Sequence, residues 1–222
     1  MTEVDYISGK VLVITGAGSG FGRQLMIECS ALGASVVGTD ISEEGLEETL
    51  RQTKKTGSAA VSCIADVTKL TDMQAVVASA VDEFGRLDVL VNNAGGALGK
   101  PKSTMASDSD EEYYQYLMDI NLNSTIFCCQ AVSQPMKESG YGRIVNISSQ
   151  AGLWSGGTGG GMPYKVAKAG IVQYTRILAA ELGPYGINVN CMAPGWILSS
   201  RAIASGRNSV ENRQSLEPQI PL

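Results

Sequence analysis

The sequence has no histidine among its 222 residues. This absence excludes, within the chain, catalytic triads that use histidine as the base and zinc sites that use imidazole ligands. Acid–base catalysis by this chain must therefore use tyrosine, lysine, cysteine, aspartate or glutamate.

Positive charge and long apolar runs are also scarce. The formal net charge is −5, so there is no basic excess of the kind that nucleic-acid binding needs. No apolar run reaches the roughly 18 residues of a membrane span, and the first residues, MTEVD, lack the basic and apolar regions of a signal peptide. We expect a soluble cytoplasmic protein with no nucleic-acid or membrane partner.

Cysteine is present but not in a pattern typical of a metal site. No two cysteines have the C-x-x-C spacing, and each lies in a segment predicted as strand or helix. We expect buried free thiols rather than disulfides or metal ligands, and we predict no metal site. The five residues are Cys29, Cys63, Cys128, Cys129 and Cys191.

Short apolar runs alternate with helix-like stretches along the chain. The runs are continuously apolar, as expected for parallel strands covered on both faces. The alternation predicts an α/β, Rossmann-type doubly wound parallel sheet in three layers, with the ligand at the carboxyl ends of the strands. The length and the 44% hydrophobic content suit a single domain over residues 1–222. The expected strands are Val11–Ile14, Ser35–Gly38, Val61–Ala65, Val89–Val91, Ile144–Ile147 and Ile187–Met192, and the expected helices lie near 20–32, 43–55, 71–84, 110–138 and 163–182.

Two stretches depart from this alternation. Leu98–Asp110 is polar and contains Pro101, so we expect a surface loop. Gly156–Gly161 has five glycines in six residues and predicts a mobile loop.

A glycine-rich turn, Thr15–Gly22, follows the first strand and opens a helix. Glycines let the backbone approach a pyrophosphate, and the helix N-terminus supplies free N–H groups. The second strand ends at Asp40, where a carboxylate can bind both ribose hydroxyls and would repel a 2′-phosphate. Neither Ser19 nor a neighbour of Asp40 is basic. The pattern therefore favours NAD(H) over NADP(H).

Asp66-Val67 ends the third strand, and two interpretations stay open on these residues alone. Asp66 could lie beside the adenine, or it could cap the following helix.

Three further polar segments follow along the chain, and two of them have an ordinary structural alternative. Asn92–Gly95 follows the fourth strand and could be an ordinary turn. Asn146–Ser149 closes the fifth strand. Tyr164 and Lys168 share a helical face at i, i+4, which is also common for a surface pair.

Taken together, these motifs resemble the short-chain dehydrogenase/reductase family, in its NAD-preferring type. They occur in the family's order and span nearly the whole chain, and the match favours the adenine contact for Asp66-Val67. The landmarks are Thr15–Gly22, Asn92–Gly95, Asn121, Ser149, Tyr164, Lys168 and Pro194-Gly195.

The resemblance implies hydride transfer between nicotinamide and a secondary alcohol or ketone, with Tyr164 as the general acid or base. Tyrosine ordinarily has a pKa of about 10, and the charge of Lys168 would favour its ionised form. Ser149 would hold the substrate oxygen, and Asn121 would hold a water in a proton relay. The implied cofactor contacts are Gly16, Ser19, Gly20, Phe21, Gly22, Asp40, Asp66, Val67, Asn93, Ala94, Gly95, Tyr164, Lys168, Pro194, Gly195, Ile197 and Ser199.

Several points stay open. Ser148 competes with Ser149, although the resemblance favours the second. The interval to Tyr164 is about two residues longer than usual, so the glycine run either reshapes the pocket or is a tolerated insertion. Trp154, Met162, Trp196 and Leu198 either line the substrate pocket or pack elsewhere.

The resemblance also bears on the end of the chain and on assembly. Family members continue past Leu222 with a helix and a seventh strand, so we expect a missing C-terminal segment. Residues 196–222 would be a substrate-covering segment or a loose tail. A homo-oligomer, tetramer or dimer, is expected.

Two other functions are weighed. A 3-oxoacyl thioester reductase of the same family would usually prefer NADPH, against which Ser19 and Asp40 argue. A catalytically idle dinucleotide-binding protein would have a broken catalytic set, whereas this one is intact.

Overall fold

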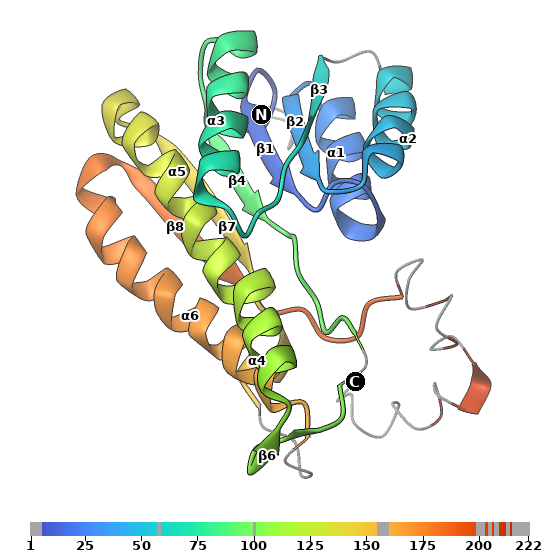
Figure 1. The fold of residues 1–222 in the computed structure, drawn as a ribbon. Helices are drawn as coiled ribbons and strands as arrows, with labels where there is room; N and C mark the ends of the chain where they lie inside the picture. Colours follow the sequence, from blue (N-terminus) through green and yellow to red (C-terminus); the bar gives the residue numbers. More distant parts are fainter. Residues whose placement is uncertain are drawn as a thin grey trace.

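A six-stranded parallel sheet forms the centre of the molecule (Figure 1). The computed structural model describes residues 6–56, 59–99, 101–154 and 160–198, together with 203, 206, 209–211 and 214. The strand order β3-β2-β1-β4-β7-β8 confirms the doubly wound α/β prediction. The strands are β1 (Val11–Thr15), β2 (Ser35–Asp40), β3 (Ala60–Ile64), β4 (Val89–Asn92), β7 (Gly142–Ile147) and β8 (Ile187–Met192).

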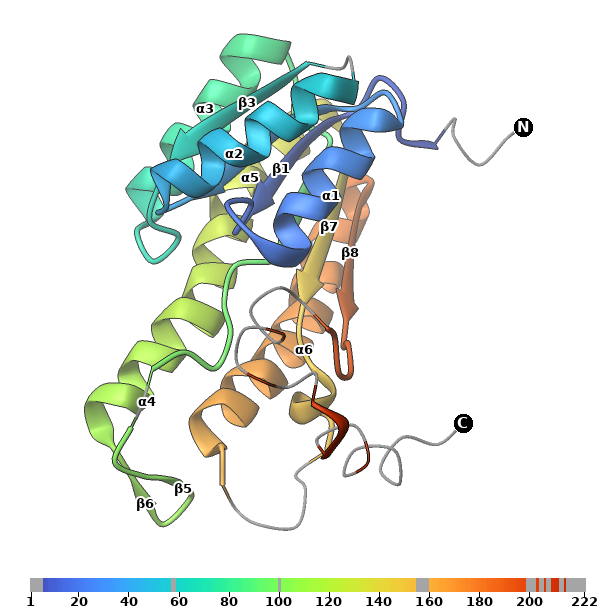
Figure 2. The ribbon, with the colours of Figure 1, turned by 90° about the vertical axis from the view of Figure 1, so that its right-hand side faces the viewer.

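Helices cover the sheet on both faces (Figures 1 and 2). The helices α1 (Gly20–Ala31) and α2 (Glu43–Thr53) lie on one face, and α3 (Leu70–Phe84), α5 (Ser124–Ser139) and α6 (Met162–Leu182) lie on the other. Two apolar clusters fill the two interfaces. The fold therefore has the three expected layers.

Strand β1 shows why these runs are continuously apolar. Its alternate side chains enter opposite clusters: Leu12 and Ile14 pack with α1 and α2, whereas Val11 and Val13 pack toward α3. Each of them is at most 3% exposed. A parallel strand with both faces covered leaves no position for a polar side chain until it reaches its carboxyl end.

Glycines and a serine define several helix ends. Ser42 caps α2, with its Oγ accepting a hydrogen bond from the Gly45 N–H, and α2 has two glutamates in its first turn. Helices α3 and α5 end at Gly85 and Gly140, which adopt left-handed backbone angles (φ 74° and 65°).

The helix predicted near 110–138 is present, but it is not α-helical throughout. It consists of α4 (Glu111–Leu117), a π-helical turn (Met118–Asn123) and α5. The other predicted helices and the strands agree with the structure to within three residues at each end. The prediction of a helix near 110–138 is therefore confirmed, and only the π-helical turn that contains Asn121 was not expected.

The polar stretch Leu98–Asp110 is also more ordered than predicted. It contains an antiparallel hairpin of β5 (Thr104–Met105) and β6 (Asp108–Ser109), so the loop prediction is wrong for these four residues. Asp110 ends the hairpin and caps α4, accepting a hydrogen bond from the Tyr113 N–H at 3.0 Å. Of the predicted glycine loop, residues 156–159 lie outside the described residues.

The cysteines are free thiols, but only Cys128 and Cys129 are buried. Cys29, Cys63 and Cys191 are partly exposed, which corrects the expectation of burial for these three. Within the described ranges, no helix is long and apolar enough to cross a membrane, and no group of three metal-ligating side chains gathers.

Candidate active site

In the glycine turn, the backbone of Gly16 lies very close to the backbone of Gly22 at the start of α1. Gly16 adopts φ +68°, which favours glycine. A Cβ at Gly22 would overlap the carbonyl oxygen of Gly16. Ser19 is the N-cap of α1, yet its side chain makes no capping hydrogen bond, and the first turn contains no acidic residue. The N–H groups at this helix start are therefore available to an anion.

Asp40 lies directly beside this turn. Its carboxylate accepts hydrogen bonds from the Gly18 N–H and the Ser42 N–H, each at 3.0 Å. The structure thus brings together the residues predicted for the phosphate and ribose contacts.

The Asn93-Ala94 segment is tied to the end of β1. The N–H groups of both residues donate to Thr15 Oγ1, at 3.1 and 3.0 Å. Asn93 Nδ2 donates to the carbonyl oxygens of Thr15 and Gly16. This segment is therefore fixed against the glycine turn. Gly95 (φ +133°) packs against Asn121 of the π-helical turn.

Asp66 does not cap helix α3, whose N-cap is Lys69. Its Oδ1 instead accepts hydrogen bonds from the N–H and the hydroxyl of Thr68, at 3.0 and 2.7 Å. The hydroxyl contact is the main cause that lowers the pKa of Asp66 below its usual 3.8. Of the two interpretations that the sequence left open, the helix cap is thereby removed.

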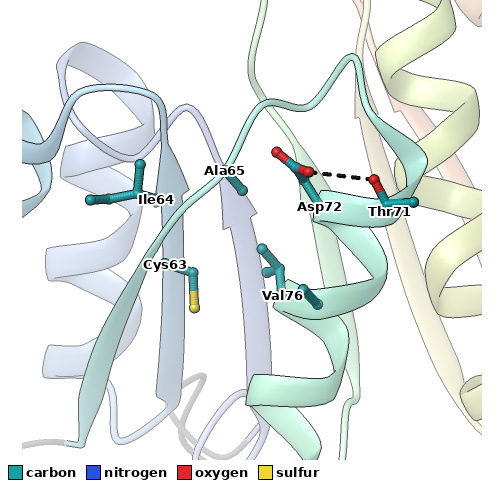
Figure 3. A pocket seen from close by; sticks show the side chains of 7 residues that line it. Cys63, Ile64, Ala65, Thr71, Asp72 and Val76 are labelled. Atoms are coloured by element: carbon teal, nitrogen blue, oxygen red, sulfur yellow. Dashed lines mark hydrogen bonds between the residues drawn. The ribbon is translucent and has the colours of Figure 1, made fainter.

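A cavity of about 340 Å³ lies behind this loop, between β3 and the first turns of α3 (Figure 3). Asp72 forms part of its wall and accepts a hydrogen bond from the Asp66 N–H at 3.1 Å. None of the predicted catalytic residues lines it, so it lies apart from the predicted catalytic set. The lining residues are Cys63, Ile64, Ala65, Thr71, Asp72, Ala75 and Val76.

Tyr164 and Lys168 lie on the first turns of α6, at the carboxyl edge of the sheet. The Lys168 ammonium is 5.7 Å from the centroid of the Tyr164 ring and donates to the Ile147 carbonyl at 2.8 Å. Lys168 is only 4% exposed. Burial lowers its pKa from 10.5 to about 8, partly offset by Cys191. The pair is therefore not the surface pair that the spacing alone allowed.

Ser148 and Ser149 are separated by their surroundings. The Ser148 hydroxyl is buried and donates to the Lys168 carbonyl at 2.6 Å. Ser149 is only partly buried, and its Oγ accepts a hydrogen bond from the Ala151 N–H at 3.2 Å, which leaves its own proton to donate. This geometry favours Ser149 for a contact with substrate.

Asn121 is fully buried in the π-helical turn. Its Oδ1 accepts from the Gly96 N–H at 2.9 Å, and its Nδ2 donates to the carbonyls of Gly96 and Leu117 at 3.1 and 3.0 Å. The side-chain amide that was predicted to hold a water is thus hydrogen-bonded to backbone groups instead.

The segment after β8 returns to the same edge. The Gln150 N–H donates to the Pro194 carbonyl at 2.9 Å, which places Pro194-Gly195 beside the turn that follows Ser149. Ile197 is about half exposed. The predicted contact Ser199 lies outside the described residues.

These residues lie along one sheet edge in the order of a known family. The profile of the short chain dehydrogenase family matches residues 10–209.

The chain belongs to the short-chain dehydrogenase family.

Individual relatives agree with this assignment. A cyclohexanol dehydrogenase from Rhodococcus sp. (strain TK6) is 37% identical over 213 residues, which cover 90% of this chain and 79% of that enzyme. The crystal structure of levodione reductase matches with a TM-score of 0.85 at 32% identity, covering 96% of this chain and 82% of that one. The crystal structure of NAD⁺-bound xylitol dehydrogenase matches with a TM-score of 0.80 at 31% identity, covering 86% and 72%.

As a short-chain dehydrogenase, the chain is an oxidoreductase that acts on the CH–OH group of alcohols or on ketones. The family uses nicotinamide cofactors, NAD or NADP. Homo-oligomeric assembly and a cytoplasmic location stay predictions.

A chain of buried hydrogen bonds in this short-chain dehydrogenase was not predicted from the sequence. Asn92 Nδ2 donates to Asn146 Oδ1 at 2.9 Å, and Asn146 Nδ2 donates to Thr175 Oγ1 at 2.9 Å. The chain of contacts connects β4 and β7 with α6, the helix of Tyr164. The available signal was an asparagine at or near the carboxyl end of each of two neighbouring strands.

Proposed function

We propose that this enzyme transfers a hydride between NAD(H) and a secondary alcohol or ketone, with Tyr164 as the general acid or base. The observation that carries the proposal is the buried ammonium of Lys168 beside the Tyr164 ring. A buried cation next to a phenol stabilises negative charge on the phenol oxygen, which a proton acceptor needs.

The residues of the phosphate end fit a dinucleotide. The helix α1 start offers N–H groups with no competing acidic side chain, and a Cβ at Gly22 would overlap the turn that must stay narrow. The pyrophosphate would bind at Ser19–Gly22, the adenosine ribose at Asp40, and the adenine beside Asp66-Val67. When bound, nicotinamide supplies or accepts the hydride.

Within the catalytic set, we assign different tasks to the four residues. Tyr164 exchanges a proton with the substrate oxygen, and Lys168 stabilises the phenolate and holds the nicotinamide ribose. Ser149 donates a hydrogen bond to the substrate oxygen. Asn121 is given a positioning role, because its amide joins the π-helical turn to Gly96.

Asp40 is expected to decide the choice of cofactor. Asp40→Ala should raise the KM for NADH by about 10- to 100-fold, because hydrogen bonds to a charged acceptor are worth roughly 1.5–3 kcal/mol each. Initial rates with NADH and NADPH would measure this.

The matched control is Asp108→Ala, which removes an exposed carboxylate on the hairpin. It should leave both KM values unchanged. A native enzyme that prefers NADPH would contradict the choice of NAD.

The surroundings of Ser149 favour an uncharged, apolar substrate body. Residues 148–154 and 192–198 contain no charged side chain. Large apolar side chains in these two segments are about half exposed or more, as is typical of a ligand-binding surface. They are Leu153, Trp154, Met192, Trp196, Ile197 and Leu198. The names of the cyclohexanol dehydrogenase and levodione reductase support an alicyclic substrate.

A substrate panel tests this choice. We expect the highest kcat/KM for uncharged cyclic alcohols and ketones, such as cyclohexanol, because a charged body would be desolvated against apolar side chains. A charged 2-hydroxy acid and acetoacetyl-CoA serve as comparisons. A preference for acetoacetyl-CoA would instead support a 3-oxoacyl thioester reductase, and NADH binding without any turnover would support an idle binder.

A further inference from the structure

Three successive carbonyl groups of the glycine turn are each held by a side chain from outside the turn. The Gly16 carbonyl accepts from Asn93 Nδ2 at 3.3 Å. Thr49 Oγ1 lies 2.8 Å from both the Ala17 and the Gly45 carbonyls. Because Arg23 also donates to the Gly45 carbonyl, we assign the single hydroxyl proton of Thr49 to Ala17. The Gly18 carbonyl accepts from Arg23 Nη2. We call Asn93, Thr49 and Arg23 the carbonyl clamp.

Thr49 and Arg23 are also bound to each other. Arg23 Nε donates to Thr49 Oγ1 at 2.9 Å, and Arg23 Nη2 donates to the Gly45 carbonyl at 3.2 Å. Thr49 is fully buried on α2, and Arg23 is partly buried on α1. The clamp therefore joins both helices of this face to the backbone of the turn.

Holding these carbonyls also sets the direction of the N–H groups that follow them. In a trans peptide, the carbonyl of one residue and the N–H of the next point in opposite directions. The Ala17 carbonyl, held by Thr49, sets the Gly18 N–H, which donates to Asp40 at 3.0 Å. The Gly18 carbonyl, held by Arg23, sets the N–H of Ser19 at the start of α1.

The packing around the turn leaves it little freedom to adopt another shape. A Cβ on Gly45 would lie 2.7 Å from the Gly18 carbonyl oxygen, and a Cβ on Gly18 would lie 2.9 Å from the Asp40 carboxyl carbon. A small rotation of either peptide would move the N–H groups away from Asp40 and from an anion at α1.

We propose that Thr49 and Arg23 are positioning residues for the dinucleotide: they orient the Gly18 and Ser19 peptides toward the adenosine ribose and the pyrophosphate. The inference rests on the proposed cofactor site. Neither residue touches the cofactor in this scheme, so both act through the backbone that they hold.

The helix α2 provides a matched pair of variants. Thr49→Val and Thr53→Val each remove a fully buried hydroxyl from the same helix, one turn apart. The Thr53 hydroxyl bonds only within the helix, to the Thr49 carbonyl at 2.8 Å. Only Thr49 reaches the glycine turn.

Calorimetric binding of ADP-ribose, together with kcat at saturating NAD, would test the proposal. Thr49→Val should weaken ADP-ribose binding on the order of fivefold or more, as expected for a lost buried hydrogen bond. Its kcat should stay within about twofold of the native value, because the reacting end is unchanged. Thr53→Val and the hydroxyl-retaining Thr49→Ser should bind like the native enzyme.

Arg23 gives a second, independent variant. Arg23→Met should weaken ADP-ribose binding more than Arg23→Lys, because lysine keeps the charge but cannot span the same acceptors. If Thr49→Val and Thr53→Val bind ADP-ribose equally well and Arg23→Met binds it like the native enzyme, the inference is overturned while the proposed cofactor site stands. A native enzyme that does not bind ADP-ribose would overturn the proposed cofactor site and the inference with it.

Discussion

Tyr164→Phe is expected to lower kcat by about 10²–10⁴-fold, the usual contribution of general acid–base catalysis. The substitution removes only the hydroxyl and retains the ring beside Lys168. Because the chain has no histidine, no imidazole of its own can replace the lost proton donor. Steady-state oxidation of cyclohexanol with NAD would measure the loss.

Two controls make this result specific. Affinity for NADH should stay within a few-fold of the native value, because the expected pyrophosphate and adenosine contacts, Ser19–Gly22 and Asp40, lie on other elements and Lys168 is retained. Tyr174→Phe, on the same helix, should keep full turnover, since burial and neighbouring Cys129 raise the pKa of Tyr174 and keep its phenol protonated. Native turnover in Tyr164→Phe would sink the proposed mechanism.

Lys168→Met is expected to lower activity strongly without a comparable loss of stability. Turnover should fall by about 10²-fold or more, because the cation that stabilises the Tyr164 phenolate is lost. The fold, however, should tolerate the change well, because burial makes the Lys168 charge unfavourable and lowers its pKa from 10.5 to about 8.

The sign of the pH dependence follows from this lowered pKa. Below pH 8 both the folded and the unfolded chain are protonated at Lys168, and the folded state bears the full penalty, at most about 3 kcal/mol. Between pH 8 and 10.5 the unfolded chain binds more protons, so this group makes stability rise with pH. Above 10.5 the penalty is absent.

Urea unfolding at pH 7 and pH 9.5 would measure the difference. The native enzyme should gain stability relative to Lys168→Met as the pH rises. Lys165→Met, on the same helix but only partly buried, is the control. It retains Lys168, so its pH profile should parallel that of the native enzyme. A native enzyme and a Lys168→Met variant with parallel pH profiles would contradict the buried-charge argument.

The reaction class and the sheet could be predicted well because their signals are local. Parallel strands that are covered on both faces need continuously apolar runs, and these runs stand out in the sequence between polar turns. The glycine turn and the Tyr164–Lys168 spacing likewise occupy short segments, so they can be found without knowing what packs against them.

Contacts between distant segments could not be predicted in this way. The π-helical turn between α4 and α5 contains Asn121, which bonds to Gly96, 25 residues earlier in the sequence. Ser148 and Ser149 are chemically identical neighbours, and only their burial distinguishes them. The hairpin of β5 and β6 has strands of two residues, which are too short for a recognisable alternation.

By itself, then, the sequence determined the order of strands and helices, the place of the glycine turn and the identity of the candidate acid–base pair. Local spacing and side-chain chemistry are sufficient for these features. Only the tertiary structure decided that Lys168 is buried beside Tyr164, and that Thr49 and Arg23 hold the turn. The reason is physical: burial and hydrogen bonds between elements depend on how the helices pack on the sheet. The identity of a single helical residue does not show whether its side chain faces the sheet or the solvent.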